Sequence, residues 1–490
     1  MHYFMSRKFS FALIVLGSLT LFSSCGEDDD PIGEEDDPIG EEIRRNQNVN
    51  DWILENMDEW YLWNDKLPVK TNKNLDPKNY FESLLYRASD RFSGIQENFT
   101  ELLESLSGVQ LEAGYDFTGG GWDENSMAGL ITYVKPNSPA SQAGLKRGDF
   151  FLTINGARLP RNNDEVLRNL QNALYANHTL EIIEGNSIRE VPLSVVKYEE
   201  NPIFLDTVYE ISNKKIGYLI YNFFAQDNGD NSLAYVKELN QVFGKLQEQS
   251  INELILDLRY NSGGAMSTSV ALASMIANRP SSDLFAKEEY NSLLDSYLRE
   301  VGGANYNKTF FQDQIEKYDM KGTVLERVAI NKLTGLNRIY VLTSSNRTAS
   351  ASELIINGLK PYMDVVLIGT TTVGKNVGSV ILYERDPQKQ KNNTWGMLPI
   401  VFKIMNAANS SDYGNGFLPD VEVDEYQELP LFPLFPLGDT EEVMLRTALT
   451  HIGVRAEKNN LRAEKTAPFS FRPVISSIDL TPARKNVVLD

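Results

Sequence analysis

Two polar residues in the second half of the chain have the types and the spacing of a catalytic pair. Ser350 and Lys375 lie 25 residues apart, and each is expected where a predicted strand gives way to a turn. A serine hydroxyl attacks a carbonyl carbon efficiently only if a base takes its proton, and a neutral lysine amine can be that base. The spacing therefore predicts a serine-lysine hydrolase.

The side chains that usually activate a nucleophile are scarce in this sequence. Its three histidines are His2, His178 and His451, and the first belongs to a leader that is expected to be removed. The sequence therefore offers few histidines that could serve as the base of a catalytic triad. The single cysteine, Cys25, is predicted to end the leader, which argues against a thiol nucleophile and against a Cys/His metal cluster. No metal or organic cofactor is expected.

Ser350 also has a purely structural interpretation. It is expected to open a helix over residues 350–359, where unpaired backbone amides can hold a developing oxyanion, and the amide of Ala351 is the natural first donor. The same run, ending at Glu353, matches a Ser-x-x-Glu capping box. Taken alone, Ser350 favours the cap, and the case for catalysis depends on Lys375.

Lys375 can be a base only if burial lowers the pKa of its amine from about 10.4 toward neutrality. Its flanks, residues 373–374 and 377–378, are small and apolar, which is consistent with a desolvated amine. The nearest acids in the sequence are Asp364 and Glu384, so no adjacent carboxylate is expected to hold the positive charge. The alternative is an ordinary surface lysine.

Two glycine-rich segments resemble phosphate-binding loops but lack part of the pattern. Residues 369–376 nearly match Gly-x4-Gly-Lys-Ser/Thr, yet Asn376 stands where a hydroxyl should meet magnesium, and a β-rich segment follows instead of a helix. No helix pattern follows Gly119 to Gly121 either, so a hairpin turn is favoured there over a phosphate cradle. Nucleotide binding is therefore disfavoured.

The first residues have the pattern of a secretory leader. Arg7 and Lys8 precede an apolar run from Phe9 to Phe22, which is about fourteen residues long and shorter than the roughly 20 that span a bilayer. The end of this run resembles the lipobox of bacterial lipoproteins, with Phe22 at the usual leucine position. It predicts cleavage before Cys25 and a lipid on its thiol, which would anchor the protein to the outer membrane of a bacterial envelope. Ordinary cleavage that leaves a free cysteine is the alternative.

An acidic segment, residues 26–44, follows the leader. Its first part, residues 26–42, holds ten acids and no base, so it repels itself, stays extended and most simply forms a tether. Acids directly after a lipidated cysteine also resemble surface-export signals in some Gram-negative lipoproteins, so the protein would face either the periplasm or the outside. Without the leader (+2) and the tether (−10), the net charge of −20 becomes −12 for residues 43–490, which disfavours nucleic-acid binding.

The rest of the chain is long and apolar enough for several domains, with 490 residues in all and 42% apolar content. Residues 45–110 are predicted to form a helical domain, on the near-helical spacing of their tryptophans. Residues 198–436 alternate strands and helices, which indicates an α/β core whose helices flank a sheet. Within that core, residues 278–336 are less regular and predict a lid or a peripheral insertion. Residues 437–490 begin with one helix and then lose clear pattern.

Between these regions, residues 111–197 resemble a PDZ domain of the bacterial, protease-associated type. The resemblance rests on four short motifs, Ser138-Pro139-Ala140, Ala143-Gly144-Leu145, Gly148-Asp149 and Ile154-Asn155-Gly156. Such a domain adds a peptide as an extra strand, while backbone amides of a loop hold its terminal carboxylate. The resemblance implies that this loop is formed by Gly114, Tyr115, Asp116 and Phe117. Asp116 would oppose a bound carboxylate if its side chain pointed inward.

Four further motifs together resemble the C-terminal processing (tail-specific) serine proteases, which have a tricorn-protease-like core. They are the run from Asp257 to Gly264, the run from Thr348 to Glu353, Gly374-Lys375, and the run from Gly416 to Asp420. The resemblance covers about residues 111–425. It implies a crotonase-like sheet with flanking helices, a PDZ domain and a helical N-terminal domain.

Carried over motif by motif, the resemblance assigns the chemistry to a few residues. It implies that Ser350 is the nucleophile, that Lys375 is the general base, and that Gly263 and Ala351 are the oxyanion donors. Glu353 is implied to be a helix-start residue near the site. Asp257 and Arg259 point the same way along a predicted strand, so we expect them to orient the glycine turn.

One position departs from the family pattern. Many members carry a glutamine four residues after the lysine, where this chain has Ser379. A serine hydroxyl can still accept a hydrogen bond from the lysine amine, over a shorter reach.

We therefore expect an endopeptidase whose PDZ domain captures exposed, apolar C-terminal tails of proteins or peptides. A degenerate member that binds peptides without cutting them, and an esterase-like hydrolase of small acyl groups, are the alternatives.

Overall fold

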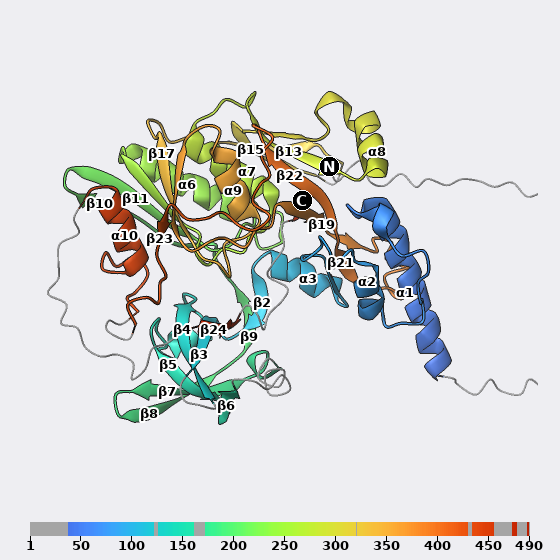
Figure 1. The fold of residues 1–490 in the computed structure, drawn as a ribbon, viewed down its shortest axis with the longest axis horizontal. Helices are drawn as coiled ribbons and strands as arrows, with labels where there is room; N and C mark the ends of the chain where they lie inside the picture. Colours follow the sequence, from blue (N-terminus) through green and yellow to red (C-terminus); the bar gives the residue numbers. More distant parts are fainter. Residues whose placement is uncertain are drawn as a thin grey trace, which may run out of the picture.

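The computed structural model describes residues 38–121, 126–160, 172–319, 321–429, 434–454, 473–477 and 488–489. Figure 1 shows a helical N-terminal region, a β-rich domain, and a larger α/β core that contacts both. The expected leader, Cys25 and most of the acidic tether lie outside the described residues. Within the described residues, no helix is both long enough and apolar enough to span a bilayer.

The N-terminal region is built from helices that pack on the core. Val49, Ile53 and Met57, four residues apart on the first helix, form a buried stripe, as expected for an amphipathic helix. Asp76 and Asn98 begin the next two α-helices by accepting backbone N–H groups with their side chains. The elements are α1 (Pro38–Trp60), η1 (Asn64–Lys66), α2 (Pro77–Leu84), β1 (Gly94–Gln96) and α3 (Phe99–Leu106).

The β-rich domain is a seven-stranded antiparallel sheet in the order β24-β3-β4-β6-β5-β7-β8, and its edge strand β24 comes from the far C-terminal end of the chain. A two-stranded pair, β2 with β9, joins this domain to the core. The elements are β2 (Val109–Glu112), β3 (Tyr115–Gly121), β4 (Ser126–Val134), α4 (Pro139–Gln142), β5 (Phe150–Ile154), β6 (Ala157–Pro160), β7 (His178–Glu184), β8 (Ser187–Leu193), β9 (Val196–Glu199) and β24 (Pro473–Ser476).

The core contains a six-stranded sheet in the order β10-β11-β12-β17-β18-β23, parallel except for the β10–β11 hairpin. Helices cover both of its faces, which confirms the predicted α/β core. The elements are β10 (Ile203–Ile211), β11 (Lys214–Tyr221), α6 (Ala234–Glu248), β12 (Glu253–Asp257), α7 (Met266–Ala277), β17 (Arg338–Thr343), α9 (Ala351–Leu359), β18 (Asp364–Gly369), β23 (Val421–Glu422) and α10 (Val443–His451).

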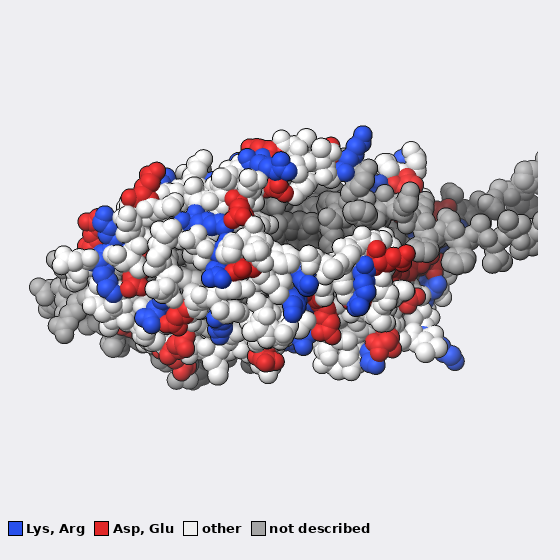
Figure 2. Space-filling model, turned by 90° about the horizontal axis from the view of Figure 1, so that it is seen from above, with Lys and Arg blue, Asp and Glu red and all other residues white. Residues whose placement is uncertain are grey.

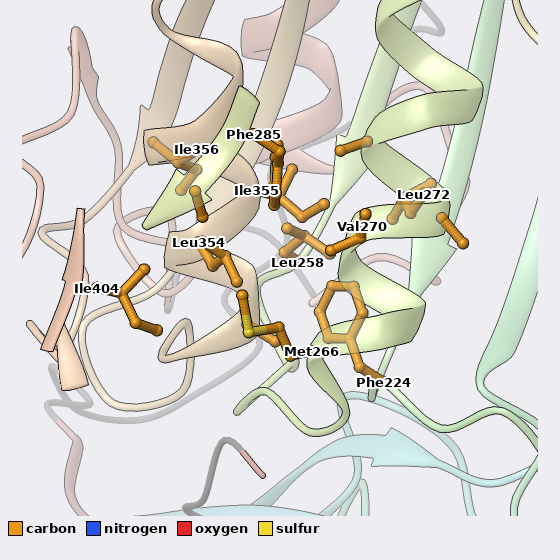
Figure 3. Close-up of a cluster of buried hydrophobic side chains, with 14 of the residues drawn as sticks. Phe224, Leu258, Met266, Val270, Leu272, Phe285, Leu354, Ile355, Ile356 and Ile404 are labelled. Atoms are coloured by element: carbon orange, nitrogen blue, oxygen red, sulfur yellow. The ribbon is translucent and has the colours of Figure 1, made fainter. Parts of the chain in front are cut away.

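Alternating strand residues bury the two faces of this sheet in different clusters. On one face, α7 and α9 pack against each other over the sheet, and Figure 3 shows Val270 of α7 beside Leu258 and Ile355. On the other face, Leu445 and Leu449 of α10 are fully buried against strand residues such as Tyr340. The sheet is therefore held from both sides at the level where β12, β17 and β18 end.

The segment 278–336, expected to be less regular than the rest of the core and to form a lid or a peripheral insertion, contains several helices and strands. β13 pairs with β22 in a second sheet, of order β14-β13-β22-β19-β25, and β15 and β16 form a hairpin. A small sheet, β1-β21-β20, joins the N-terminal region to the core. The elements are β13 (Leu284–Tyr290), α8 (Ser292–Gly302), η2 (Gly303–Asn305), β14 (Lys308–Phe310), β15 (Gln314–Tyr318), β16 (Val324–Ala329), β19 (Val377–Val380), β20 (Leu382–Tyr383), β21 (Gly396–Leu398), β22 (Ile400–Asn406) and β25 (Val488–Leu489).

Charge on the surface is mixed. Figure 2 shows acidic and basic side chains interspersed among other residues over the described part of the face seen from above. That face of the described residues offers no continuous basic surface for a polyanion.

Candidate active site

Ser350 sits in a strained turn at the start of α9. Its backbone adopts φ 68° and ψ −115°, a left-handed conformation that costs a residue with a Cβ of the order of 1–3 kcal/mol. Its side chain is buried, and within the described residues its hydroxyl has no hydrogen-bond partner. The Glu353 part of the predicted capping box is formed by a 2.8 Å bond from the Ser350 N–H to the Glu353 carboxylate. The hydroxyl is thus held in place by the backbone and left available for reaction.

Lys375 lies in the turn between β18 and β19 and is fully buried. Burial lowers the pKa of its amine to about 7, against the opposing charges of Asp90 and Glu353, which favour the ammonium. At this pKa a large fraction of the amine is neutral near pH 7. Lys375 is therefore not an ordinary surface lysine, and a proton acceptor is available close to neutrality.

Glu353 joins the backbones of the two candidate catalytic residues. One of its carboxylate oxygens accepts the N–H of Ser350 at 2.8 Å and the N–H of Lys375 at 2.7 Å. The other oxygen accepts the N–H of Gly374 at 2.7 Å and the hydroxyl of Thr372. The backbones at positions 350 and 375 are therefore adjacent, because they share a single acceptor atom.

The pKa of Glu353 reflects its burial. Desolvation raises the pKa, while the hydrogen bonds that the carboxylate accepts act in the opposite direction. The sequence indicated a helix-start residue near the site. The carboxylate does more than that, because it connects the helix start to the turn that carries Lys375.

The glycine turn after β12 reaches Ser350. Gly263 has φ +111°, and a Cβ there would lie 2.7 Å from the Cβ of Ser350 and 3.1 Å from the amide nitrogen of Ala351. Only a glycine allows this approach. In this structure, however, the Gly263 N–H donates to the side-chain oxygen of Asn261 at 2.9 Å. Gly263 lies where an oxyanion donor is needed, but its N–H has a competing acceptor.

Asp257 and Arg259 have the structural role that the sequence predicted. Arg259 is completely buried, and its guanidinium contacts Asp257 on its own segment and forms a two-pronged pair with Glu442, at 2.8 and 2.9 Å. This network fixes the chain immediately before the glycine turn.

The N-terminal region supplies a third wall of the site. Asp90 accepts hydrogen bonds from the Tyr61 hydroxyl at 2.8 Å and from the backbone of the following residues. Arg91 donates to the carbonyl of Gly374 at 2.8 Å, and the Phe92 ring centroid lies 5.3 Å from the Lys375 Nζ. The expectation that no adjacent carboxylate favours the positive charge of Lys375 is wrong, because Asp90 and Glu353 both favour it, but burial outweighs them and the pKa still falls to about 7.

Sequence reasoning missed Asp90 because it considered only acids close to Lys375 along the chain. The charge of Asp90 acts on Lys375 because the N-terminal region docks on the core. No motif or spacing in the sequence could have identified this interaction.

Ser379, at the position of the family glutamine, is buried in β19. Within the described residues its hydroxyl has no hydrogen-bond partner, so the hydrogen bond from the Lys375 amine considered above is absent from this structure. Arg91 at the Gly374 carbonyl and the Phe92 ring near the Lys375 amine provide an alternative means of positioning this lysine.

The predicted PDZ loop residues mostly lie in a strand. Gly114, with φ +85°, precedes β3, and Tyr115, Asp116 and Phe117 are its first residues. The Asp116 carboxylate does not stand alone, since it pairs with Arg347 at 2.8 Å. Arg347 lies three residues before Ser350, so this ion pair links the PDZ edge to the loop that carries the nucleophile.

The prediction of a turn at Gly119 to Gly121 is wrong. These residues end β3, and Gly119 pairs with Gly129 of β4. A Cβ at Gly119 would lie 2.8 Å from the side chain of Ile475. The glycine makes room for a neighbouring strand and does not make a turn.

A pocket lies between the PDZ edge and the glycine turn. Its lining includes Asp116, Tyr133, Phe223, Gly263, Gly264 and Arg347. The pocket thus reaches from Asp116, at the start of β3, to the glycine turn that lies against Ser350.

Comparison with known proteins agrees with this geometry. Residues 215–423 match the model of peptidase family S41, residues 48–94 that of the peptidase S41 N-terminal domain, and residues 130–184 that of a PDZ domain. The α/β core thus belongs to peptidase family S41, and the N-terminal region matches that family's N-terminal domain. The resemblance proposed from the motifs is confirmed, as is the multidomain S41 fold with a PDZ domain and an N-terminal domain.

Several proteins show the S41 similarity over most of the chain. A crystal structure of a candidate S41 protease from Bacteroides fragilis NCTC 9343 superposes with a TM-score of 0.63 at 27% identity, covering 82% of this chain and 97% of that one. A "Probable CtpA-like serine protease" of Staphylococcus aureus (strain COL) is 22% identical over 360 residues, 71% of this chain and 63% of that protein. "Carboxy-terminal processing protease CtpA" of Bacillus subtilis (strain 168) is 26% identical over 333 residues, 66% of this chain and 61% of that protein. The match thus spans less than two thirds of these curated relatives.

Proposed function

We propose that this protein is a serine endopeptidase in which Lys375 activates Ser350, and that it cleaves proteins captured by their C-terminal tails. The observation that carries the proposal is the single Glu353 oxygen that accepts the N–H of both residues, in a site where the lysine is buried and its pKa is lowered to about 7. The curated relatives, one named as a probable CtpA-like serine protease and one as a carboxy-terminal processing protease, support the same class of reaction.

The proposed reaction begins with the neutral amine of Lys375, which takes the proton of the Ser350 hydroxyl as the oxygen attacks the peptide carbonyl carbon. The carbonyl oxygen becomes an oxyanion, and the N–H of Ala351 at the start of α9 faces it. The Gly263 N–H joins as second donor once it exchanges its bond to Asn261 for the oxyanion. The lysine ammonium then protonates the departing amine as the C–N bond breaks. Water, deprotonated by Lys375, hydrolyses the acyl-enzyme, and the proton returns to Ser350.

The experiment compares the wild-type chain with Ser350→Ala and Lys375→Ala on an unfolded protein that bears either an apolar or a charged C-terminus. We expect the wild type to cut the apolar-tailed form faster and both variants to lose at least about a thousandfold in kcat/KM. Ser345→Ala and Lys360→Ala, which alter an exposed serine and an exposed lysine, are the matched controls. Full activity in Lys375→Ala would exclude the proposed dyad.

Peptide binding without cleavage is the second candidate function. It is favoured by the bond from the Gly263 N–H to Asn261 and by the lack of a hydrogen-bond partner for the Ser379 hydroxyl within the described residues. Equal recovery of intact substrate from the wild type and from Ser350→Ala would support this function. Turnover of short esters but not of tailed peptides would instead support an esterase.

We also propose that a lipid on Cys25 anchors the protein to the bacterial outer membrane. The lipobox-like leader and the acidic tether support this proposal. Expression of the full chain and of Cys25→Ser in a Gram-negative host tests it by detergent partitioning and mass spectrometry. An unmodified Cys25 in the mature chain would exclude the anchor.

A further inference from the structure

The edge of the PDZ sheet is already paired with a strand from the C-terminal end of this chain. β24 runs antiparallel to β3, with Ile475 opposite Gly119 and Ser476 opposite Thr118. The Thr118 hydroxyl also donates to the carbonyl of Ile475 at 3.0 Å. PDZ domains take their peptide ligands in this way, as an added edge strand. Figure 1 shows β24 beside β3.

Side chains of the segment are seated as those of a ligand would be. Ile475 packs against the hydrophobic core of the PDZ domain and lies over Gly119, where a Cβ would come within 2.8 Å of it. Val474, on the opposite side of the strand, is 72% exposed. The edge thus selects one aliphatic side chain and leaves its neighbour in solvent.

Ser477, the last described residue of this segment, lies where a ligand's terminal group is expected. The Phe117 N–H donates to the Ser477 hydroxyl oxygen at 3.2 Å, and Arg347 donates to the same oxygen at 3.2 Å. The Ser477 hydroxyl in turn donates to Asp116 at 2.9 Å. The Ser477 hydroxyl oxygen therefore binds the Phe117 amide and the Arg347 guanidinium, the two groups that would receive a ligand's carboxylate.

The last described residues of the chain, Val488 and Leu489, lie beside the strand that follows Lys375. β25 pairs in parallel with β19, with Val488 opposite Ser379. β19 follows Lys375, and β25 also contacts α7, the helix that follows the glycine turn. The described residues after 472 therefore contact the rest of the chain at two places, the edge strand β3 of the PDZ sheet and the strand β19 that follows Lys375.

We infer that residues 473–477 are an intramolecular ligand of the PDZ domain, and that a substrate tail must displace them before it is cut. The inference rests on the proposed function, because it takes the β3 edge to be the substrate-binding edge. It also defines the partner: an extended tail with an aliphatic residue in the place of Ile475 and an oxygen-bearing end group in the place of Ser477. Arg347 neutralises Asp116, so a carboxylate end group is not repelled.

The test uses the full chain with point variants that separate the two sides of β24. Ile475→Asp places a charge against the PDZ core, and Val474→Asp places the same charge in solvent. In the Ser350→Ala background, the affinity for a fluorescent peptide with an apolar C-terminus is measured by anisotropy, and hydrogen exchange is followed at residues 115–121. With active Ser350, kcat/KM for a tailed substrate is measured in the same variants.

We expect Ile475→Asp to speed exchange along β3, to tighten peptide binding by about tenfold if the segment occupies the edge about nine-tenths of the time, and to raise kcat/KM in proportion. Val474→Asp should behave as the parent chain. A synthetic peptide of residues 471–480 should compete with the fluorescent peptide on the Ile475→Asp chain.

Two different results would overturn the inference, and they are distinguishable. If the parent chain binds and cleaves tailed substrates and Ile475→Asp changes neither affinity nor exchange, the proposed function stands and the intramolecular ligand does not. If Ile475→Asp exposes β3 but no tailed peptide binds or is cut by any variant, the edge is not a substrate site and the proposed recognition of tails fails with it.

Discussion

In the proposed mechanism, Lys375 can act as a base only because of where its side chain is placed. Burial lowers the pKa of its amine to about 7, whereas the charges of Asp90 and Glu353 push that pKa upward. The neutral form reacts, so activity belongs to the high-pH side of this titration. Moderate changes around the amine should therefore move the pH dependence of catalysis more than they move substrate binding.

The first prediction concerns the wild-type pH profile. We expect kcat/KM to fall about tenfold per pH unit below a midpoint near 7, and to level off above it, because protonation of Lys375 removes the base. Steady-state kinetics between pH 5 and 9 on a substrate without titratable groups measures this. A flat profile across pH 7 would contradict the lysine mechanism.

A second prediction concerns Asp90. Asp90→Asn removes a negative charge that favours the ammonium, so the pKa of Lys375 should fall and the activity midpoint should move to lower pH. The amide oxygen can still accept the N–H groups of Phe92 and Ser93, and its NH₂ group can donate to the Tyr61 hydroxyl oxygen. Asp65→Asn, an exposed acid of the same region, is the control and should leave the midpoint in place. A merely structural role for Asp90 would lower the melting temperature without shifting the midpoint.

Glu353 connects a helix to a turn, and the relative position of these two elements determines whether the two catalytic residues meet. Both of its oxygens accept N–H groups, two on one oxygen and one on the other, along with the Thr372 hydroxyl. A carboxylate can satisfy all four donors, whereas an amide presents one oxygen and one NH₂ group.

We therefore expect Glu353→Gln to leave at least one buried N–H facing another donor, at a cost of about 1–3 kcal/mol in unfolding free energy. This unfavourable contact should push the start of α9 and the turn with Lys375 apart. Because Ser350 and Lys375 then lie farther from each other, kcat should drop by about a hundredfold while KM changes little. Denaturant unfolding and steady-state kinetics check both parts. Glu422→Gln, an exposed carboxylate, is the control, and wild-type kcat in Glu353→Gln would exclude the connecting role.

At the scale of the entire chain, buried ions join the PDZ domain to the core. Arg147 of the PDZ domain donates to Glu425 at 2.9 Å and to the backbone carbonyl of Phe435 at 2.8 Å. Glu425 also accepts the hydroxyl of Tyr260, which stands in the motif before the glycine turn. Removing one partner from such a buried network leaves the other charges uncompensated.

The corresponding prediction is that Arg147→Met destabilises the docked arrangement by about 3–5 kcal/mol and lets the PDZ domain move independently of the core. Calorimetry should then show two transitions in place of one, and small-angle scattering should show a larger radius of gyration. Lys146→Met, at the exposed neighbouring position, should change neither. A single unshifted transition in Arg147→Met would mean that other contacts hold the domains together.

Where the sequence failed, the missing information lay in a different segment. Gly119 was expected in a turn, but its small size serves β24, which arrives from more than 350 residues away. For Lys375, only the acids nearest in the sequence were considered, whereas Asp90 acts on it from the N-terminal region. Both errors come from treating a residue's neighbours in the chain as its neighbours in space.

The order of short motifs was enough to predict the S41 family, the α/β core, the PDZ domain and the candidate residues Ser350 and Lys375. These features depend on backbone geometry within a few residues, such as a glycine turn after a strand, and local sequence records such geometry directly. The charges of Asp90 and Glu353 that oppose the effect of burial on Lys375, the ion pair between Asp116 and Arg347, and the strand that fills the PDZ edge required the folded chain. They arise from burial and from contacts between domains, and these depend on how distant surfaces fit together when the domains dock.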